Sequence, residues 1–462
     1  MSHTSSGPEW VLDEVFYQIF PDRFARSDRE DGNTDLMAWG RAPSVEGFFG
    51  GDLTGIEQHL DYLDDLGITS LYLTPIFTAT TNHRYDTVDY FSIDSRLGDK
   101  HSFDSLVQSL HKCGKHIILD AVFNHCSNES YQFQDVVEHQ GSSPFVNWFY
   151  VNDFPVVSTP EPNYLTFEGV ANLPKLNSYN PEVRDYLCKV GQYWIQQGID
   201  GWRLDVPYLV ENDSFWEIFR EKIKGMNSDA YIVAEVWEEA RDWAGKGKSD
   251  GAMNYRWRDA TLEWVTDWRV TGKDYALRLK KIEEEIGVEN KAFMLNLLGS
   301  HDTERLITHV GGDYDVAKLC FGLLMTAEGI PMIYYGDEIG IPGFNDPGCR
   351  ACMPWNEERP AGLGAESPVS DLHRWIKELI QVRKNHIALR RGEEHTIYSS
   401  NDIIAQLRSH PDEKILIVAN RSESLRHIAL GQSYAKDLLT GENVDLSHIG
   451  VPAKYVRILQ YT

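Results

Sequence analysis

The feature that most constrains the fold is a unit that repeats through the first two-thirds of the chain. Each unit is a short β-branched or aromatic run, a polar loop and an amphipathic helix. This alternation is typical of a parallel sheet whose strands are joined by crossover helices. The helical patterns include 56–66, 102–113, 183–197 and 214–224. Eight strands with intervening helices predict an α/β fold of the closed (β/α)8 or TIM barrel type; the candidate strands are 15–20, 69–73, 116–120, 199–205, 231–235, 252–254, 293–297 and 331–335.

Two segments depart from this pattern. The stretch 126–179 is long, weakly periodic and rich in Pro, Asn, Ser and aromatic residues, so we expect a subdomain inserted after the third strand. After a helix predicted over 371–383, the chain changes to short alternating segments separated by turn residues, which is typical of a small antiparallel β-sandwich. The predicted domains are therefore a barrel over 10–125 and 180–388, an inserted subdomain over 126–179 and a C-terminal sandwich over 389–462. The candidate tail strands are 396–399, 403–407, 415–419, 427–430 and 455–459.

The charge and the chain's first residues limit the function classes. Forty-four Lys and Arg face 70 Asp and Glu, and the formal net charge of −26 repels nucleic acid and anionic membranes. A neutral substrate therefore fits best. Residues 1–7 lack a secretory pattern and no apolar run reaches the roughly 20 residues of a membrane helix, so we expect a cytoplasmic protein. The six cysteines are scattered, which favours reduced thiols, and the Cys349/Cys352 pair has no second pair to complete a zinc site.

Polar residues end four of the predicted barrel strands. In a barrel enzyme, functional groups lie at the carboxyl ends of the strands, where the loops begin. Several carboxylates, two imidazoles and a guanidinium are therefore expected on one rim. By strand order, these residues are Asp120, Asn124 and His125, then Arg203 and Asp205, then Glu235, and finally His301 and Asp302.

Two of these carboxyl groups have the setting that retaining glycoside hydrolysis requires. That reaction needs a nucleophilic carboxylate and, about 5–5.5 Å away, a carboxylic acid that protonates the leaving oxygen. Asp205 follows Arg203 by two residues, and a nearby permanent cation favours the charged form, so we predict that Asp205 is the nucleophile. Glu235 follows an apolar run, and burial near a second carboxylate favours the protonated form, so we predict that Glu235 is the acid/base.

The remaining rim residues have supporting roles in this interpretation. Asp302 is expected to bind sugar hydroxyls more tightly as the ring flattens toward an oxocarbenium ion. His125 and His301 can donate hydrogen bonds to the same ring. Taken alone, each acid is more often part of a structural ion pair and each histidine a structural hydrogen bonder. Their occurrence on four strands in order favours catalysis.

Four segments resemble the conserved regions of the α-amylase family of glycoside hydrolases. They are Asp120-Ala-Val-Phe-Asn-His125, Gly201-Trp-Arg-Leu-Asp205, Glu235-Val-Trp237 and Leu298-Gly-Ser-His-Asp302. The segment Asn82-His83-Arg84-Tyr85-Asp86 is similar to a further family motif that lines the non-reducing side of the cleavage point. The resemblance implies the three catalytic acids predicted above, and substrate-binding roles for His83, Tyr85, His125, Arg203, His301 and Trp237.

The segment Leu173-Pro-Lys-Leu-Asn177 resembles a signature of the neopullulanase, cyclomaltodextrinase and maltogenic amylase branch. The resemblance implies a retaining hydrolase of α-1,4-glucosidic bonds in maltooligosaccharides, cyclodextrins or starch. Members of that branch carry an extra N-terminal β-domain that helps build a dimer. Here the barrel begins almost at once, so we expect a monomer or weak homo-oligomer with a more open acceptor side. Glu238, Pro207 and Tyr208 differ from the branch pattern near the leaving-group side, which leaves the preferred glucan open.

The resemblance implies no cofactor for the chemistry but includes a possible structural calcium ion. Relatives often bind calcium in the loop after the first strand, where Asp28, Asp31 and Asp52 offer hard oxygen ligands. The alternative is an acidic, solvated loop.

Three other functions compete with hydrolysis of short α-glucans. A transglycosylase would pass the same covalent intermediate to a sugar hydroxyl, and a plain α-amylase would prefer starch. A catalytically inactive binding subunit is disfavoured because such proteins usually lose a catalytic carboxylate or gain a membrane anchor, and this chain keeps all three acids and shows no anchor.

Overall fold

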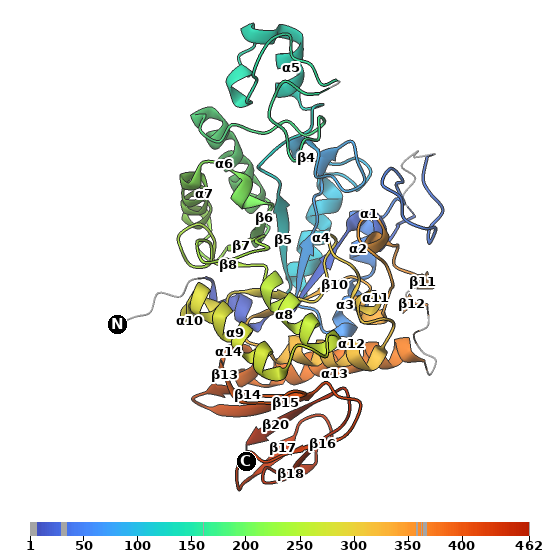
Figure 1. Ribbon diagram of the computed structural model, residues 1–462. Helices are drawn as coiled ribbons and strands as arrows, with labels where there is room; N and C mark the ends of the chain where they lie inside the picture. Colours follow the sequence, from blue (N-terminus) through green and yellow to red (C-terminus); the bar gives the residue numbers. More distant parts are fainter. Residues whose placement is uncertain are drawn as a thin grey trace.

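A computed structural model describes residues 7–28, 35–159, 161–356, 359–361, 363 and 367–461. Eight parallel strands form the central sheet in the order β8-β7-β6-β5-β2-β1-β10-β9 (Figure 1). A parallel bridge between Met253 and Leu295 joins the two ends of this order and closes the barrel. All eight strands expected from the sequence are present, and the predicted barrel is confirmed; the strands are β1 Phe16–Ile19, β2 Ser70–Leu73, β5 His116–Ala121, β6 Gly201–Leu204, β7 Tyr231–Ala234, β8 Gly251–Ala252, β9 Leu295–Leu297 and β10 Ile330–Tyr334.

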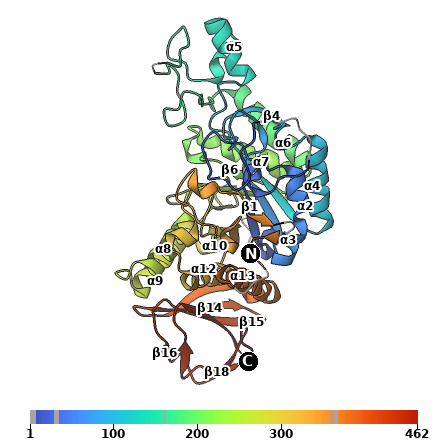
Figure 2. The same cartoon turned by 90° about the vertical axis from the view of Figure 1, so that its right-hand side faces the viewer.

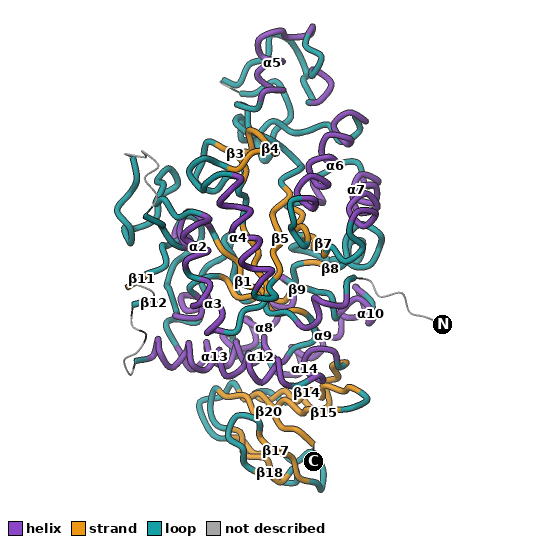
Figure 3. Tube along the Cα trace, turned by 180° about the vertical axis from the view of Figure 1, so that it is seen from behind, coloured by secondary structure: helices purple, strands orange, loops and turns teal. Residues whose placement is uncertain are grey.

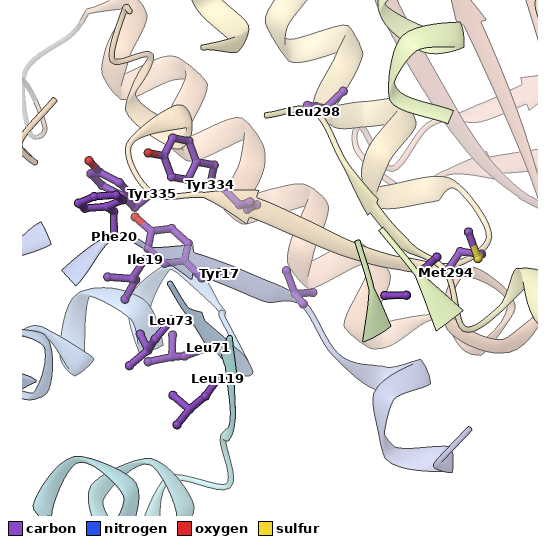
Figure 4. Close-up of a cluster of buried hydrophobic side chains, with 14 of the residues drawn as sticks. Tyr17, Ile19, Phe20, Leu71, Leu73, Leu119, Met294, Leu298, Tyr334 and Tyr335 are labelled. Carbon is purple, nitrogen blue, oxygen red and sulfur yellow. The ribbon is translucent and has the colours of Figure 1, made fainter. Parts of the chain in front are cut away.

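The strands are apolar on both faces because both faces are buried. One set of side chains fills the barrel interior, among them Phe16, Tyr72, Ile118, Val233 and Met332. The alternate set points outward and packs under the helices. Figure 4 shows members of this outer set on neighbouring strands: Tyr17, Ile19, Leu71, Leu73 and Leu119.

Helices surround the barrel and follow the strands along the chain (Figure 2). Side-chain caps begin several of them, for example Asp52 before α2, Asp99 before α4 and Asn254 before α8. These helices are α1 Pro21–Phe24, α2 Leu53–Gln58, α3 Leu60–Leu66, α4 Lys100–Lys112, α6 Pro181–Gln196, α7 Asp213–Met226, α8 Tyr255–Thr266, α9 Gly272–Ile286, α10 Val288–Lys291, α11 Leu306–His309, α12 Tyr314–Thr326, α13 Pro368–Asn385 and α14 Ile387–Arg391, with short 3-10 turns at Glu9–Asp13, Pro207–Leu209, Asp337–Ile339 and Gly348–Arg350.

One predicted helix is wrong in its continuity. The segment expected as a single helix over 56–66 is two helices, α2 and α3, that meet at His59, where φ is −108° and ψ is 17°. The His59 ring packs against Trp355, with centroids 4.1 Å apart, and Nδ1 of His59 contacts the carbonyl oxygen of Gly55 at 2.7 Å. The break is thus associated with a contact to Trp355, almost 300 positions away in the sequence, so the local sequence pattern could not predict it.

The long segment between β5 and α6 projects beyond the barrel at the end where the strands terminate (Figure 1). It contains α5 Tyr131–His139 and the 3-10 turns Gln140–Ser142 and Val146–Trp148, and it is otherwise held by isolated bridges such as those of Phe149 with Leu176 and Val151 with Tyr164. Phe133, Phe149 and Tyr164 form its small aromatic core through edge-on contacts. A separate hairpin, β3 Phe77–Ala79 and β4 Thr87–Ile93, precedes α4.

The C-terminal region has two antiparallel sheets that enclose an apolar core of their own. It lies beneath the row formed by α12, α13 and α14, as Figures 1 and 3 both show. A further two-stranded ribbon, β11 Trp355–Asn356 with β12 Arg359–Pro360, precedes α13. The C-terminal strands are β13 Glu393–Ser399, β14 Ile403–His410, β15 Glu413–Asn420, β16 Arg426–Ile428, β17 Tyr434–Asp437, β18 Asn443–Asp445, β19 Ile449–Val451 and β20 Tyr455–Tyr461. Over the described residues, none of the helices has the length and apolar character needed to span a membrane.

Candidate active site

One buried guanidinium lies at the centre of the polar rim. Arg203, on β6, is fully buried, and its Nη1 contacts Oδ1 of Asp120 at 2.9 Å and Oδ1 of Asp205 at 2.8 Å. Its Nη2 lies 2.7 Å from Oε1 of Glu235. Because β5, β6 and β7 are hydrogen-bonded neighbours, three carboxyl groups from three consecutive strands meet around one cation.

Asp120 is the anchor of this cluster. Its Oδ2 accepts hydrogen bonds from the hydroxyl groups of Tyr72 at 2.6 Å and Tyr85 at 2.8 Å, and the residue is 1% exposed. Its carboxylate is thus committed to Arg203 and two phenols. It holds the guanidinium in place beside the other two carboxyl groups.

Glu235 receives donors on both of its oxygens. The backbone N–H of Val206 donates to Oε2 at 2.8 Å, and Nε1 of Trp237 donates to Oε1 at 3.2 Å. Val206 has φ 32° and ψ 49°, which is the left-handed region and costs a β-branched residue conformational energy. Such strain is typical of functional sites. Here it directs the peptide that follows Asp205 toward Glu235.

Burial dominates the protonation of the two candidate catalytic acids. It raises the pKa of Asp205 well above its usual range and raises the pKa of Glu235, while Arg203 lowers both. Arg203 contacts Asp205 and lowers its pKa, which is the influence expected of a nearby cation, whereas burial raises the pKa. One cation faces three carboxyl groups, so the cluster holds protons jointly and titrates as a unit. The charge on Asp205 and the proton on Glu235 therefore depend on each other.

Asp302 completes the rim from the loop after β9. Its Oδ2 lies 3.0 Å from Nε2 of His301, and its Oδ1 lies 3.2 Å from an Nη2 of Arg350. Nε2 of Gln18 donates to Nδ1 of His301 at 2.9 Å, so the imidazole proton is on Nε2, facing Asp302. Burial keeps the pKa of His301 well below its usual value, which makes the ring a neutral donor.

The other predicted sugar-binding residues join the same network. The Tyr85 hydroxyl lies 2.5 Å from Nε2 of His301, and the two rings are parallel with centroids 5.4 Å apart. His125 donates from Nε2 to the carbonyl oxygen of Tyr85 at 3.1 Å, and Nδ1 of His83 accepts from the Tyr85 N–H at 3.1 Å. Burial lowers the pKa of His83 and of His125 to about 4, so both rings are neutral. The nine predicted catalytic and substrate-binding residues therefore form one connected site.

Sequence reasoning missed three residues that support this site. Tyr72 lies inside a strand, where the sequence pattern predicts a core residue, although its hydroxyl group donates a hydrogen bond to Asp120. Gln18 lies in the first strand, and its contact with His301 spans most of the chain. Arg350 lies in the 3-10 turn Gly348–Arg350 after the last barrel strand, and only the fold brings it to Asp302.

The predicted calcium ligands are not gathered into a site. Asp52 is buried and caps α2, since Oδ1 accepts from the N–H of Gly55 at 2.6 Å and Oδ2 accepts from the Ser27 hydroxyl at 2.7 Å. Arg26 donates from Nη2 to the carbonyl oxygen of Met37 at 3.2 Å and from Nε to that of Phe49 at 3.0 Å. Asp28 is exposed and Asp31 lies outside the described residues.

Among the described residues no group of three or more His, Cys, Asp or Glu is placed to hold a metal ion. The described part of this loop therefore does not fit calcium, and structural calcium stays a prediction.

Residues 18–415 match a family model that is described as "Alpha amylase, catalytic domain". The chain belongs to the α-amylase family. It is 42% identical over 443 residues to a cyclomaltodextrinase of Geobacillus thermopakistaniensis, covering 94% of this chain and 74% of that protein. It is 41% identical over 433 residues to an intracellular maltogenic amylase of Bacillus subtilis, covering 92% and 71% respectively.

Among solved structures, this α-amylase-family chain is similar to a cyclic α-maltosyl-(1→6)-maltose hydrolase from Arthrobacter globiformis. The TM-score is 0.90 at 43% identity, and the match covers 98% of this chain and 99% of that one. The fold and the enzyme class expected from the sequence are thus confirmed: the protein is a glycoside hydrolase of α-glucans.

Proposed function

We propose that the enzyme cleaves α-1,4-glucosidic bonds with retention, using Asp205 as nucleophile, Glu235 as acid/base and Asp302 as transition-state stabiliser. The observation that carries this proposal is the position of Arg203, whose two terminal nitrogens contact Asp205 and Glu235 at 2.8 and 2.7 Å. Two carboxyl groups joined by one guanidinium suit the short separation of about 5–5.5 Å of retaining enzymes rather than the wider gap that admits a water molecule.

In the first step, an oxygen of Asp205 forms a bond to the anomeric carbon while the bond to the glycosidic oxygen breaks. Glu235 transfers its proton to that departing oxygen, which leaves as a free sugar hydroxyl. Burial raises the pKa of Glu235 and so keeps the proton available near neutral pH. Once it has lost the proton, the carboxylate is held by the N–H groups of Val206 and Trp237.

In the second step, Glu235 takes a proton from water, the water oxygen bonds to the anomeric carbon, and the bond to Asp205 breaks. The enzyme returns to its starting protonation state and the product keeps the α-configuration. Asp302, oriented by His301 and Arg350, binds ring hydroxyls most tightly when the ring is flattened and positively charged. Neutral His83, His125 and His301 supply hydrogen bonds without adding a charge that would repel the oxocarbenium ion.

Short and cyclic α-glucans are the substrates that we propose, namely maltooligosaccharides and cyclodextrins. The similarity to the cyclomaltodextrinase supports this range. The similarity to the Arthrobacter globiformis hydrolase extends over nearly the full length of both chains. It supports cyclic α-maltosyl-(1→6)-maltose as a specific candidate substrate. Two alternatives remain. A plain α-amylase would prefer starch as its substrate, and a transglycosylase would use a sugar acceptor in place of water.

The test is a product time course with β-cyclodextrin, maltotriose, cyclic α-maltosyl-(1→6)-maltose and soluble starch. Faster turnover of the three small substrates supports the proposal, and a preference for starch contradicts it. Products longer than the substrate at high maltotriose concentration would assign the enzyme to transglycosylation. Proton NMR of the first product must show the α-anomer if the reaction proceeds with retention.

Matched variants test the residue roles. Asp205→Asn and Glu235→Gln preserve side-chain shape, so folding measured by circular dichroism should be unchanged while turnover is abolished. Turnover retained by either variant would refute the role of that residue.

We also propose that the enzyme acts in the cytoplasm as a monomer or weak homo-oligomer. A net charge of −26 opposes self-association, and the similarity to an intracellular maltogenic amylase supports the location. Light scattering after size-exclusion chromatography and fractionation of the native cells test the two parts. A stable dimer at micromolar concentration, or activity in the culture medium, would contradict them.

A further inference from the structure

The side chain of Trp237 contacts the candidate acid/base directly. Trp237 lies two residues after Glu235, and its Nε1 donates to Oε1 of that residue at 3.2 Å. The indole ring stacks on Tyr255, with centroids 3.9 Å apart and planes 13° apart. Tyr255 begins α8 and is fully buried, and its hydroxyl donates to Oγ of Ser300 at 3.4 Å.

This stack fixes the direction in which the indole N–H points. A buried tyrosine with a satisfied hydroxyl is a rigid support, and a stacked indole cannot rotate its N–H away from the carboxyl group without losing that contact. Glu235 is therefore held from two sides, by Trp237 at Oε1 and by the backbone of Val206 at Oε2. Its plane is fixed before substrate binds.

We propose that Trp237, supported by Tyr255, is a positioning residue that orients the carboxyl group of Glu235 and eases its release of the proton. This inference rests on the proposed role of Glu235 as acid/base. An N–H donor stabilises the carboxylate more than the protonated acid, so Trp237 limits the increase in proton affinity that burial causes. The residue thereby serves both steps, which need Glu235 protonated and then ionised.

The charged and titratable groups that face Glu235 come from several elements. Arg203 on β6 lowers its pKa, and the carboxylate of Asp302, after β9, raises it. The carboxyl group of Asp205 and the phenols Tyr72, Tyr208 and Tyr255 also interact electrostatically with Glu235. Trp237 is uncharged. Removing its N–H therefore changes the proton affinity of Glu235 without changing the net charge of the cluster.

Trp237→Phe tests the proposal because phenylalanine keeps an aromatic ring over Tyr255 and lacks the N–H. Tyr255→Phe is the matched control, since it keeps the stack and the indole N–H and loses the contact with Ser300. We expect Trp237→Phe to lower kcat/KM for maltotriose about tenfold and to move the basic limb of the kcat/KM profile up by about half a pH unit. The basic limb of Tyr255→Phe should stay at the wild-type pH.

A second substrate separates positioning from sugar binding. Fluoride departs from an α-glucosyl fluoride substrate with little need for a proton. The kcat/KM of Trp237→Phe should therefore fall much less on this substrate than on maltotriose. A rise in KM on both substrates, with an unmoved basic limb, would overturn the inference and leave Trp237 as a sugar contact only.

Glu235→Gln distinguishes failure of this inference from failure of the proposed function. If that variant is inactive on maltotriose while the Trp237→Phe limb is unmoved, only the positioning role is refuted. If Glu235→Gln retains maltotriose turnover, the acid/base assignment itself is refuted.

Discussion

Val206 offers the sharpest test of the idea that backbone strain orients the acid/base. Its φ of 32° places a β-branched, buried residue in the left-handed region. Glycine adopts this region without steric cost, whereas a residue with a Cβ atom pays about 1–2 kcal/mol. Both Val206→Ala and Val206→Gly remove the buried branched side chain, and only the glycine variant also removes the strain. Val206→Gly should therefore be more stable than Val206→Ala by about 1 kcal/mol, although alanine is the more stabilising residue at most positions.

The size of the expected signal follows from the length of the chain. An unfolding entropy of about 2.1 cal/mol/K per residue gives a chain of 462 residues roughly 1 °C in Tm for each kcal/mol. Differential scanning fluorimetry of the two variants side by side resolves such a difference. The glycine variant should also show the lower kcat, because an unstrained peptide no longer fixes the N–H on Oε2 of Glu235. A glycine variant that melts below the alanine variant would refute the strain argument.

Three further predictions concern other parts of the structure. Asp302→Asn should lower kcat by orders of magnitude with little change in KM, because its contacts strengthen in the transition state, and an effect confined to KM would contradict that role. Burial raises the pKa of Glu338 from 4.5 to about 7, so wild-type stability should fall by about 3 kcal/mol as pH rises through this window. Glu338→Gln should remove this slope in Tm between pH 4.5 and 7, and an equal slope in both proteins would disprove it. A chelator tests the predicted structural calcium ion: a bound ion would make Tm fall on chelation and recover with calcium and not with magnesium, whereas an unchanged Tm would contradict calcium and agree with the protein partners of Arg26 and Asp52.

The barrel could be predicted from the sequence because its signals are local. Each strand is a short apolar run bounded by polar loops, and each outer helix has one apolar face, so both patterns lie within about fifteen residues. The break at His59 could not be predicted in this way, since it depends on packing against Trp355.

In the active site too, candidate residues with a local sequence signal could be predicted, and residues that depend on distant contacts could not. Asp205, Glu235 and Asp302 could be predicted as candidates because functional groups of barrel enzymes lie at the carboxyl ends of the strands and in the loops that follow them. Gln18, Tyr72 and Arg350 act through other side chains, and their partners lie 283, 48 and 48 positions away in the sequence. The left-handed backbone of Val206 has no sequence signal, because valine is among the residues least suited to that conformation.

The cluster around Arg203 also shows what the sequence argument about Asp205 left out. Proximity to an arginine was expected to keep this carboxyl ionised, but the same guanidinium also contacts Asp120 and Glu235. Asp120 is satisfied by two tyrosine hydroxyls in addition to Arg203, so it is the carboxyl best able to carry a fixed charge. The remaining charge of the cluster is then shared between Asp205 and Glu235. With one buried cation among three acids, Asp205 is ionised as the nucleophile while Glu235 holds the proton, which is the protonation state that the first step requires.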